Sequence, residues 1–238
     1  MDPLCEERAG ESPYIFAAAN PVMFTDPTGC IVEGDSLFIA YQVKLQNDYN
    51  LLKDDQKATK YVDYIKKQQS HINQLKESSQ LYIINHDKNA KTGSTIYDSN
   101  RDAVIVNYII KSITNPFENL SHELNHAWQF ENGDLSIRYD GSAGLLYDIY
   151  DEVESYNVSN QIYHACLYYD HSSPKDANGN YYQITKKILQ DPQGSYYYYY
   201  GKLPTKQRSL NKKTQKILQN LNSNGIVEYY INWKKDLQ

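Results

Sequence analysis

The sequence predicts an α+β fold, in which a small antiparallel sheet is flanked along the chain by helices. Three observations support this class. Apolar side chains recur at three- and four-residue steps over residues 36–79, which is typical of an amphipathic helix. Short stretches rich in β-branched and aromatic residues follow over residues 81–110, separated by Asn, Asp, Gly and Lys. Residues 114–131 and 145–169 then return to a helical pattern.

Length and composition exclude several classes of protein. The chain has 238 residues, of which 40% are hydrophobic and 22% charged, so it is neither a disordered nor a membrane-embedded polypeptide. A formal net charge of −5 argues against nucleic-acid binding through phosphate neutralisation. Cys5, Cys30 and Cys166 lie too far apart to form a metal-binding pair or a disulfide framework. No basic and apolar leader opens the sequence, so we expect no secretory signal in this chain.

The central helix has clear boundary signals. It should begin at Thr114-Asn115-Pro116, where Asn115 can cap it and proline suits the first turn, and it should end at Asn132-Gly133. The other expected elements are strands at 81–85, 94–97 and 102–110, a polar loop at 134–144, a long helix at 145–169, a loop-like stretch at 170–204, an amphipathic helix at 205–222 and a strand or helix at 227–233.

The motif that carries chemistry is H-E-x-x-H, spelled by His122-Glu123-Leu124-Asn125-His126. On a helix, His122 and His126 lie one turn apart on one face, so both imidazoles can bind one metal ion. Glu123 lies about 100° around the helix, where it can hold a water molecule at the metal and accept its proton. On the order of 0.01 such motifs are expected by chance in a chain of this composition. A metal site is therefore favoured over a structural pair of histidines.

A catalytic zinc site needs a third protein ligand. Residues 131–134 contain no histidine, so the motif does not continue to the spacing of the three-histidine class. The predicted helix at 145–169 offers four acids, Asp148, Asp151, Glu152 and Glu154. Glu152 lies about 60° from the centre of the apolar face of this helix, whereas Glu154 lies about 140° away. Glu152 is therefore the preferred ligand, and Glu154 is the alternative.

An H-E-x-x-H motif followed by a glutamate on a later helix resembles the gluzincin metallopeptidases. Several members have a small residue three positions after that glutamate, and Ser155 stands there in this chain. The resemblance covers about residues 37–170 and implies a zincin-like fold. It also implies one zinc ion bound by His122, His126 and Glu152, with Glu123 as the general base. A peptide substrate would pair along one edge of the small sheet.

A tetrahedral intermediate needs a further hydrogen-bond donor, which the sequence leaves open. The candidates are Tyr139, Tyr147, Tyr156 and His164, although packing is the more common role of tyrosine in a chain that has 24. The tyrosine run at 196–200 is expected to form a packed strand rather than to line a cleft. His71, His86 and His171 are expected at the surface, and Cys166 as a buried, inert thiol.

The first thirty residues carry a second resemblance. They contain Asp2-Pro3-Leu4, Ser12-Pro13-Tyr14, Asn20-Pro21 and Asp26-Pro27-x-Gly29, in that order. This series of turn motifs is similar to the end of an RHS (YD-repeat) core domain. The resemblance implies that residues 1–30 are the end of a β-shell within a longer polypeptide. Residues 31–36 would then be a linker, and residues 37–238 a separate zincin-like domain, often a toxin in that family.

The two resemblances together predict a zinc-dependent endopeptidase that is the effector or toxin domain of an RHS protein. The expected partners are a protein or peptide substrate, the RHS shell and a cognate immunity protein, with no nucleic acid and no membrane span. Secretion or delivery to a cell surface would depend on the parent polypeptide. The alternatives are a non-catalytic recognition domain with a zincin-like fold and a zinc amidase for cell-wall peptides. Glu123 favours an enzyme, because a structural zinc site does not need this carboxylate.

Overall fold

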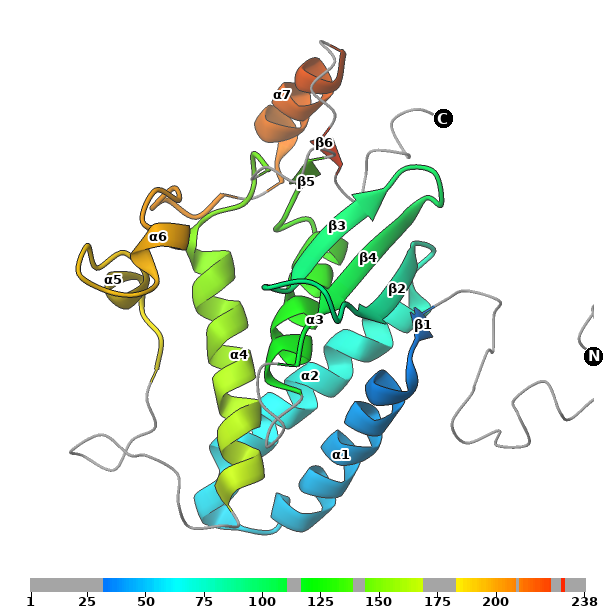
Figure 1. The fold of residues 1–238 in the computed structure, drawn as a ribbon, viewed down its shortest axis with the longest axis vertical. Helices are drawn as coiled ribbons and strands as arrows, with labels where there is room; N and C mark the ends of the chain where they lie inside the picture. The colour runs from blue at the N-terminus through cyan, green and yellow to red at the C-terminus, as the bar shows by residue number, and fades with distance from the viewer. Residues whose placement is uncertain are drawn as a thin grey trace, which may run out of the picture.

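A computed structural model describes residues 32–110, 117–138, 144–168, 183–208, 210–223 and 228–229 (Figure 1). The architecture is α+β, as predicted. The helices are α1 (Ser36–Leu52), the 3-10 helix η3 (Gln56–Ala58), α2 (Thr59–Glu77), α3 (Glu118–Glu131), α4 (Ile149–Tyr168), α5 (Lys186–Leu189), α6 (Tyr197–Tyr200) and α7 (Lys212–Ser223). The strands are β1 (Val32–Gly34), β2 (Leu81–His86), β3 (Ser94–Asp98), β4 (Ala103–Tyr108), β5 (Ile137–Arg138) and β6 (Glu228–Tyr229).

The predicted helical segment at 36–79 consists of two long helices. The Asp35 carboxylate caps α1 by accepting hydrogen bonds from the backbone N–H groups of Leu37 and Phe38. After α1 ends, the Asp55 carboxylate caps η3 by accepting from the Lys57 backbone N–H at 2.8 Å. The two adjacent aspartates at 54–55 favour this break, because their side chains compete with the helical backbone for hydrogen bonds.

The prediction of an antiparallel sheet is wrong, because the sheet is mixed. Its strand order is β1-β2-β4-β3, in which β1 and β4 both pair with β2 in parallel and only β3 pairs with β4 in antiparallel fashion. A helical crossover, α1 and α2, separates β1 from β2 and permits their parallel pairing. The strand β1 falls within the stretch predicted as a linker. Side-chain alternation locates strands but does not give their direction, which explains the error.

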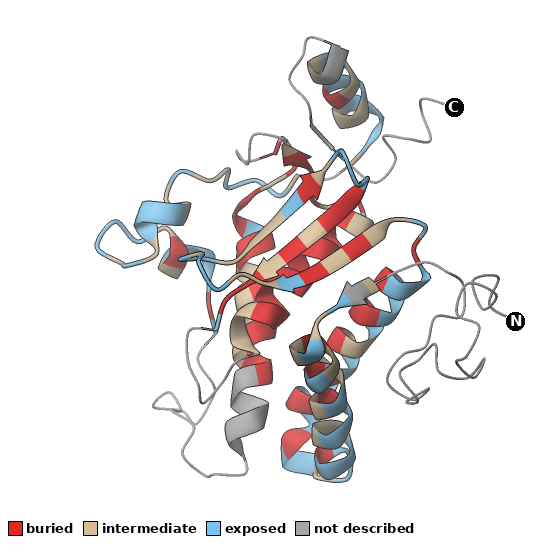
Figure 2. Cartoon of the chain, turned by 45° about the vertical axis from the view of Figure 1, so that its right-hand side comes forward, coloured by how far each residue is buried: buried red, intermediate tan, exposed pale blue. Residues whose placement is uncertain are grey.

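Helix α3 lies at the centre of the core. Figure 1 shows it beneath the sheet, with α2 and α4 at its sides, and Figure 2 shows that its residues are largely buried. The core includes the inward-facing strand residues Tyr82, Ile84, Val104, Val106 and Tyr108, together with Leu120, Leu124 and Ala127 of α3. Because α3 is covered on several sides, its polar residues are buried as well.

The boundaries of the two central helices differ from the predicted ones. Helix α3 begins at Glu118 without a side-chain cap, and the predicted cap at Asn115 lies outside the described residues. It ends as predicted at Asn132-Gly133, where Gly133 has a φ of 78°, a conformation that favours glycine. Helix α4 begins at Ile149 rather than at residue 145, because the Asp148 carboxylate accepts a hydrogen bond from the Tyr150 backbone N–H at 2.8 Å and caps the first turn.

The elements of the C-terminal third differ from the predicted ones, and helix α7 begins at Lys212 rather than at residue 205. Two short helices, α5 and α6, interrupt the expected loop, and the tyrosine run forms the helical turn α6 instead of a packed strand. Strand β6 pairs with β5, which lies in the segment predicted as a polar loop. These elements lack strong local periodicity, so tertiary contacts determine them. Within the described part of the chain, no helix is both long and apolar enough to cross a bilayer.

Candidate metal centre

Helices α3 and α4 bring His122, His126 and Glu152 to one point. The two histidine Nε2 atoms lie 3.1 Å apart, as expected for residues one helical turn apart. Glu152 Oε1 lies 3.2 Å from His126 Nε2, and Glu152 Oε2 lies 3.4 Å from His122 Nε2. All three side chains are buried. One potential ligand atom from each residue therefore lies within 4.8 Å of the others.

The spacing of these atoms fits a divalent ion. Tetrahedral zinc, with bonds of about 2.0–2.1 Å to nitrogen and oxygen, holds its ligand atoms about 3.3 Å apart. The histidine nitrogens lie 3.1 Å apart. His126 Nε2 lies 3.2 Å from Glu152 Oε1 and His122 Nε2 lies 3.4 Å from Glu152 Oε2, so each imidazole has one carboxylate oxygen at close to this spacing. In addition, the buried Glu152 Oε2 has no hydrogen-bond partner among the described residues. A buried carboxylate oxygen without a donor favours a cation nearby.

Electrostatics at the cluster also favour a positive charge. Burial by itself would raise the pKa of the Glu152 carboxyl, but the His126 and His122 imidazoles outweigh burial and hold that pKa well below its usual range. Burial would likewise lower the pKa of His126, yet the Glu152 carboxylate outweighs it and raises the pKa to about 9. The pair therefore retains a buried anion that either a proton or a metal ion can neutralise.

Glu123 lies beside the two histidines on the same helix. Its Oε2 accepts a hydrogen bond from Thr95 Oγ1 at 3.2 Å, and its Oε1 lies 3.5 Å from Asn119 Nδ2. A Cβ atom at Gly93 would lie 2.4 Å from Glu123 Oε1, so the observed position of this carboxylate requires glycine at residue 93. Burial raises the pKa of the Glu123 carboxyl, and the two histidines oppose that shift.

Glu154, the alternative third ligand, points away from the cluster. Its carboxylate pairs with Lys67 Nζ at 2.5 Å and accepts a hydrogen bond from Gln129 Nε2 at 3.0 Å. The structure therefore brings Glu152, and not Glu154, to the histidines. Ser155, the small residue of the family pattern, is fully buried, with its Oγ 3.3 Å from His126 Nδ1.

The remaining sequence candidates divide into three groups. Tyr147 donates a hydrogen bond to Glu152 Oε1, and the Tyr156 ring lies edge-on to His122 with centroids 4.5 Å apart. Tyr139, His171 and the side chains of His164 and Cys166 lie outside the described residues. The prediction that His71 is at the surface is wrong: it is 3% exposed and stacks on Trp128, since α2 packs this histidine against α3, whereas His86 is half-buried.

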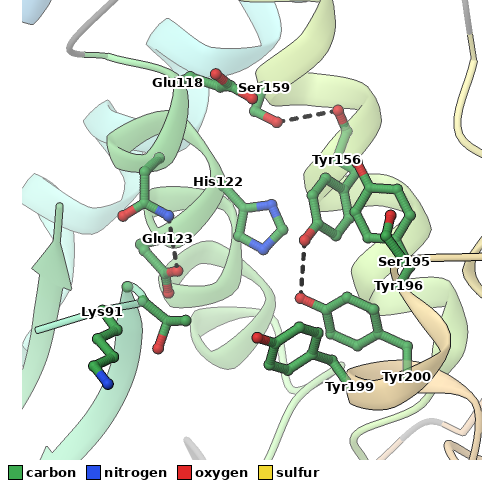
Figure 3. Close-up of a pocket in the computed structure, with 13 residues that line it drawn as sticks. Lys91, Glu118, His122, Glu123, Tyr156, Ser159, Ser195, Tyr196, Tyr199 and Tyr200 are labelled. Carbon is green, nitrogen blue, oxygen red and sulfur yellow. Dashed lines mark hydrogen bonds between the residues drawn. The ribbon is translucent and has the colours of Figure 1, made fainter. Parts of the chain in front are cut away.

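A two-chambered cleft reaches the cluster. The chambers have volumes of about 360 and 310 Å³ and share Thr92, Gly93, His122, Glu123, Tyr199 and Tyr200 in their walls. The larger chamber is also lined by Tyr156 and Tyr196, while the other contains His126, Glu152 and residues of β3 and β5. Figure 3 shows His122 between Glu123 and the tyrosine side chains. The site is therefore open to a ligand on two sides.

Sequence reasoning missed the part of the cleft formed by α6. Tyr200 Oη lies 2.9 Å from Tyr156 Oη, so one of the two hydroxyls donates to the other. The run of five tyrosines was the available signal, but its distance of some 70 residues from the motif gave no indication of contact. Sequence reasoning also did not predict that the Gln129 side chain lies next to His126.

No protein-family model, curated protein or solved structure matches this chain. Its own geometry is therefore the basis for assigning a function. The buried group of His122, His126 and Glu152 has the composition of an H-E-x-x-H…E site, and it could hold one metal ion.

Proposed function

We propose that this chain is a zinc-dependent peptidase, in which His122, His126 and Glu152 bind the ion and Glu123 is the general base. The observation that carries the proposal is the convergence of two imidazoles and one carboxylate in a cleft, with a second carboxylate beside them. Among the described residues only three ligands meet, whereas a structural zinc site closes with four. This difference favours catalysis over a purely structural metal.

Each protein group would have a defined part in hydrolysis. Bound zinc supplies a Lewis acid that polarises the substrate carbonyl and lowers the pKa of water. The Glu123 carboxylate would accept the proton of the attacking water and deliver it to the leaving amine. Thr95 and Asn119 hold this carboxylate in place, and burial raises its pKa towards the range in which a base is effective.

The tyrosine pair offers a donor for the developing oxyanion. One hydroxyl of Tyr156 and Tyr200 donates to the other, which leaves one hydroxyl hydrogen free to bind a ligand in the cleft. Both rings line the larger chamber next to His122. We infer that this pair, rather than Tyr147, donates to the oxyanion, because the Tyr147 hydroxyl already donates to Glu152.

A peptide substrate suits the edge of the mixed sheet. Strand β3 is an edge strand, and its residues Ser94, Thr95 and Ile96 line the chamber that contains His126 and Glu152. An extended peptide can pair with the free backbone groups of such a strand. This position supports the substrate strand that the gluzincin resemblance implies.

The biological setting follows only from the N-terminal resemblance. We propose that the peptidase is the effector of an RHS polypeptide, delivered by that parent protein and controlled by an immunity protein. Residues 1–30, which carry the resemblance, lie outside the described residues. The support for this setting is therefore their four ordered turn motifs.

The experiment that tests the function compares the wild type with Glu123→Gln. We expect Glu123→Gln to retain zinc and to lose peptide-bond cleavage by about 10²–10⁴-fold, because the amide has no basic oxygen. Cleavage of an unfolded protein and of cell-wall peptides should be followed separately by mass spectrometry. Unchanged cleavage by the variant would contradict the mechanism, and activity on cell-wall peptides alone would favour the amidase alternative.

A further inference from the structure

The two ring nitrogens of His126 have different surroundings. Nε2 faces the metal cluster, 3.1 Å from His122 Nε2. Nδ1 faces away from it, 2.8 Å from Gln129 Oε1. Gln129 follows His126 by three residues on α3, so the two side chains lie on the same face of the helix. Both are buried, with Gln129 only 1% exposed.

The orientation of the Gln129 amide is fixed by its nitrogen. Nε2 donates to the Asp151 backbone carbonyl at 3.1 Å and to Glu154 Oε2 at 3.0 Å. A carbonyl oxygen and a carboxylate oxygen only accept, so the reversed amide would place oxygen against oxygen twice. The amide oxygen must therefore face His126 Nδ1.

An amide oxygen cannot donate, and this determines the tautomer of His126. Nδ1 must carry the proton that Gln129 Oε1 accepts, so the neutral imidazole has its lone pair on Nε2, the nitrogen that faces the cluster. Ser155 Oγ also lies near Nδ1, at 3.3 Å, but a hydroxyl can donate or accept and does not select a tautomer. Gln129 is thus the group that selects the tautomer of His126.

Glu154 in turn holds the Gln129 amide. Its other oxygen, Oε1, pairs with Lys67 Nζ of α2 at 2.5 Å, so the carboxylate is fixed between two helices. A continuous polar chain runs from Lys67 through Glu154 and Gln129 to His126, and it joins α2, α4 and α3. These contacts give a structural role to Glu154, the alternative third ligand of the sequence analysis.

We propose that Gln129 is a positioning residue that fixes the Nε2-binding tautomer of His126, and that Glu154 sets the orientation of Gln129. The proposal rests on the proposed metal site and deepens it. It distinguishes a site in which zinc displaces a proton from Nε2 alone from one in which the proton must also move between the two nitrogens of His126.

The test measures zinc affinity of the full chain by competition with a chromophoric chelator. Gln129→Met removes the acceptor at nearly constant volume, and we expect it to weaken zinc binding about 10–100-fold. The matched control is Gln161→Met, because Gln161 is also a fully buried glutamine, on α4, and makes no hydrogen bond among the described residues. Its affinity should equal that of the wild type.

Equal zinc affinity of folded Gln129→Met and wild type would overturn the positioning role, as would an equal loss in Gln161→Met. A wild type that binds no zinc would overturn the proposed function as well, which separates the two failures. A second measurement does not depend on a variant that folds: nitrogen-15 NMR of the zinc-bound wild type should show a protonated Nδ1 and a metal-bound Nε2 on His126. Metal on Nδ1 would also overturn the proposal.

Discussion

At the residue scale, the Tyr156–Tyr200 pair has one hydroxyl hydrogen that it can donate to a ligand. One hydroxyl donates to its partner at 2.9 Å, and the hydrogen of the other is available to the cleft. If either ring is changed to phenylalanine, the remaining hydroxyl is freed and can still donate. We therefore expect Tyr156→Phe and Tyr200→Phe to reduce kcat modestly and the double variant to reduce it about 10²–10³-fold.

Single-turnover kinetics on a peptide substrate would measure these effects. The control is Tyr198→Phe, because Tyr198 belongs to the same run but is 88% exposed and lines neither chamber. A double variant as active as Tyr198→Phe would exclude the pair as oxyanion donors.

Gly93 allows a second prediction at this scale. An added Cβ would lie 2.4 Å from Glu123 Oε1 and 2.5 Å from Asn119 Oδ1, and both atoms are at the ends of side chains that can move. Gly93→Ala should therefore displace Glu123, the proposed general base, rather than unfold the protein, and lower kcat about 10-fold or more. Wild-type kcat for Gly93→Ala would show that Glu123 does not need its observed position.

At the scale of the helices, the burial of His71 between α2 and α3 makes the stability of the protein depend on pH. Burial, together with the nearby Lys67 charge, lowers the pKa of His71 to about 4. The unfolded chain binds this proton near its ordinary pKa of about 6.5, so the free energy of unfolding should fall as the pH drops from about 6.5 to 4. At pH 5, His71 should lower the free energy of unfolding by about 2 kcal/mol relative to neutral pH.

The variant His71→Phe retains the stack on Trp128 and has no proton to bind. Urea unfolding of both zinc-free chains at pH 7 and pH 5 isolates the effect, because all other groups titrate alike in the two proteins. We expect the variant to lose less stability than the wild type on acidification. An identical loss in both chains would show that His71 is not the group responsible.

The elements also show what the sequence could and could not predict. The H-E-x-x-H helix and the strands β2, β3 and β4 follow from local periodicity, so their positions were predictable. The choice of Glu152 over Glu154 followed from helical angles within α4, and the structure places only Glu152 in the cluster. Strand direction, the burial of His71 and the approach of α6 to the cleft depend on contacts between distant segments, and no local pattern encodes them.

Metal binding should stabilise the whole molecule, because the proposed ligands come from two helices at the centre of the core. A ligand present at about 1,000 times its Kd stabilises the folded state by about 4 kcal/mol. For a domain of this size, removal of zinc should lower Tm by roughly 8–16 °C. Differential scanning calorimetry with zinc and with a chelator would measure the shift. The same Tm in both conditions would argue against a metal that joins α3 and α4.

Metal analysis of the purified full chain is the most direct test of the central claim, that His122, His126 and Glu152 bind one zinc ion. The structure predicts one zinc per wild-type chain and much less in His122→Ala and Glu152→Ala, with full retention in Gln161→Met. A wild type without bound metal, or equal zinc in the wild type and His122→Ala, would contradict it.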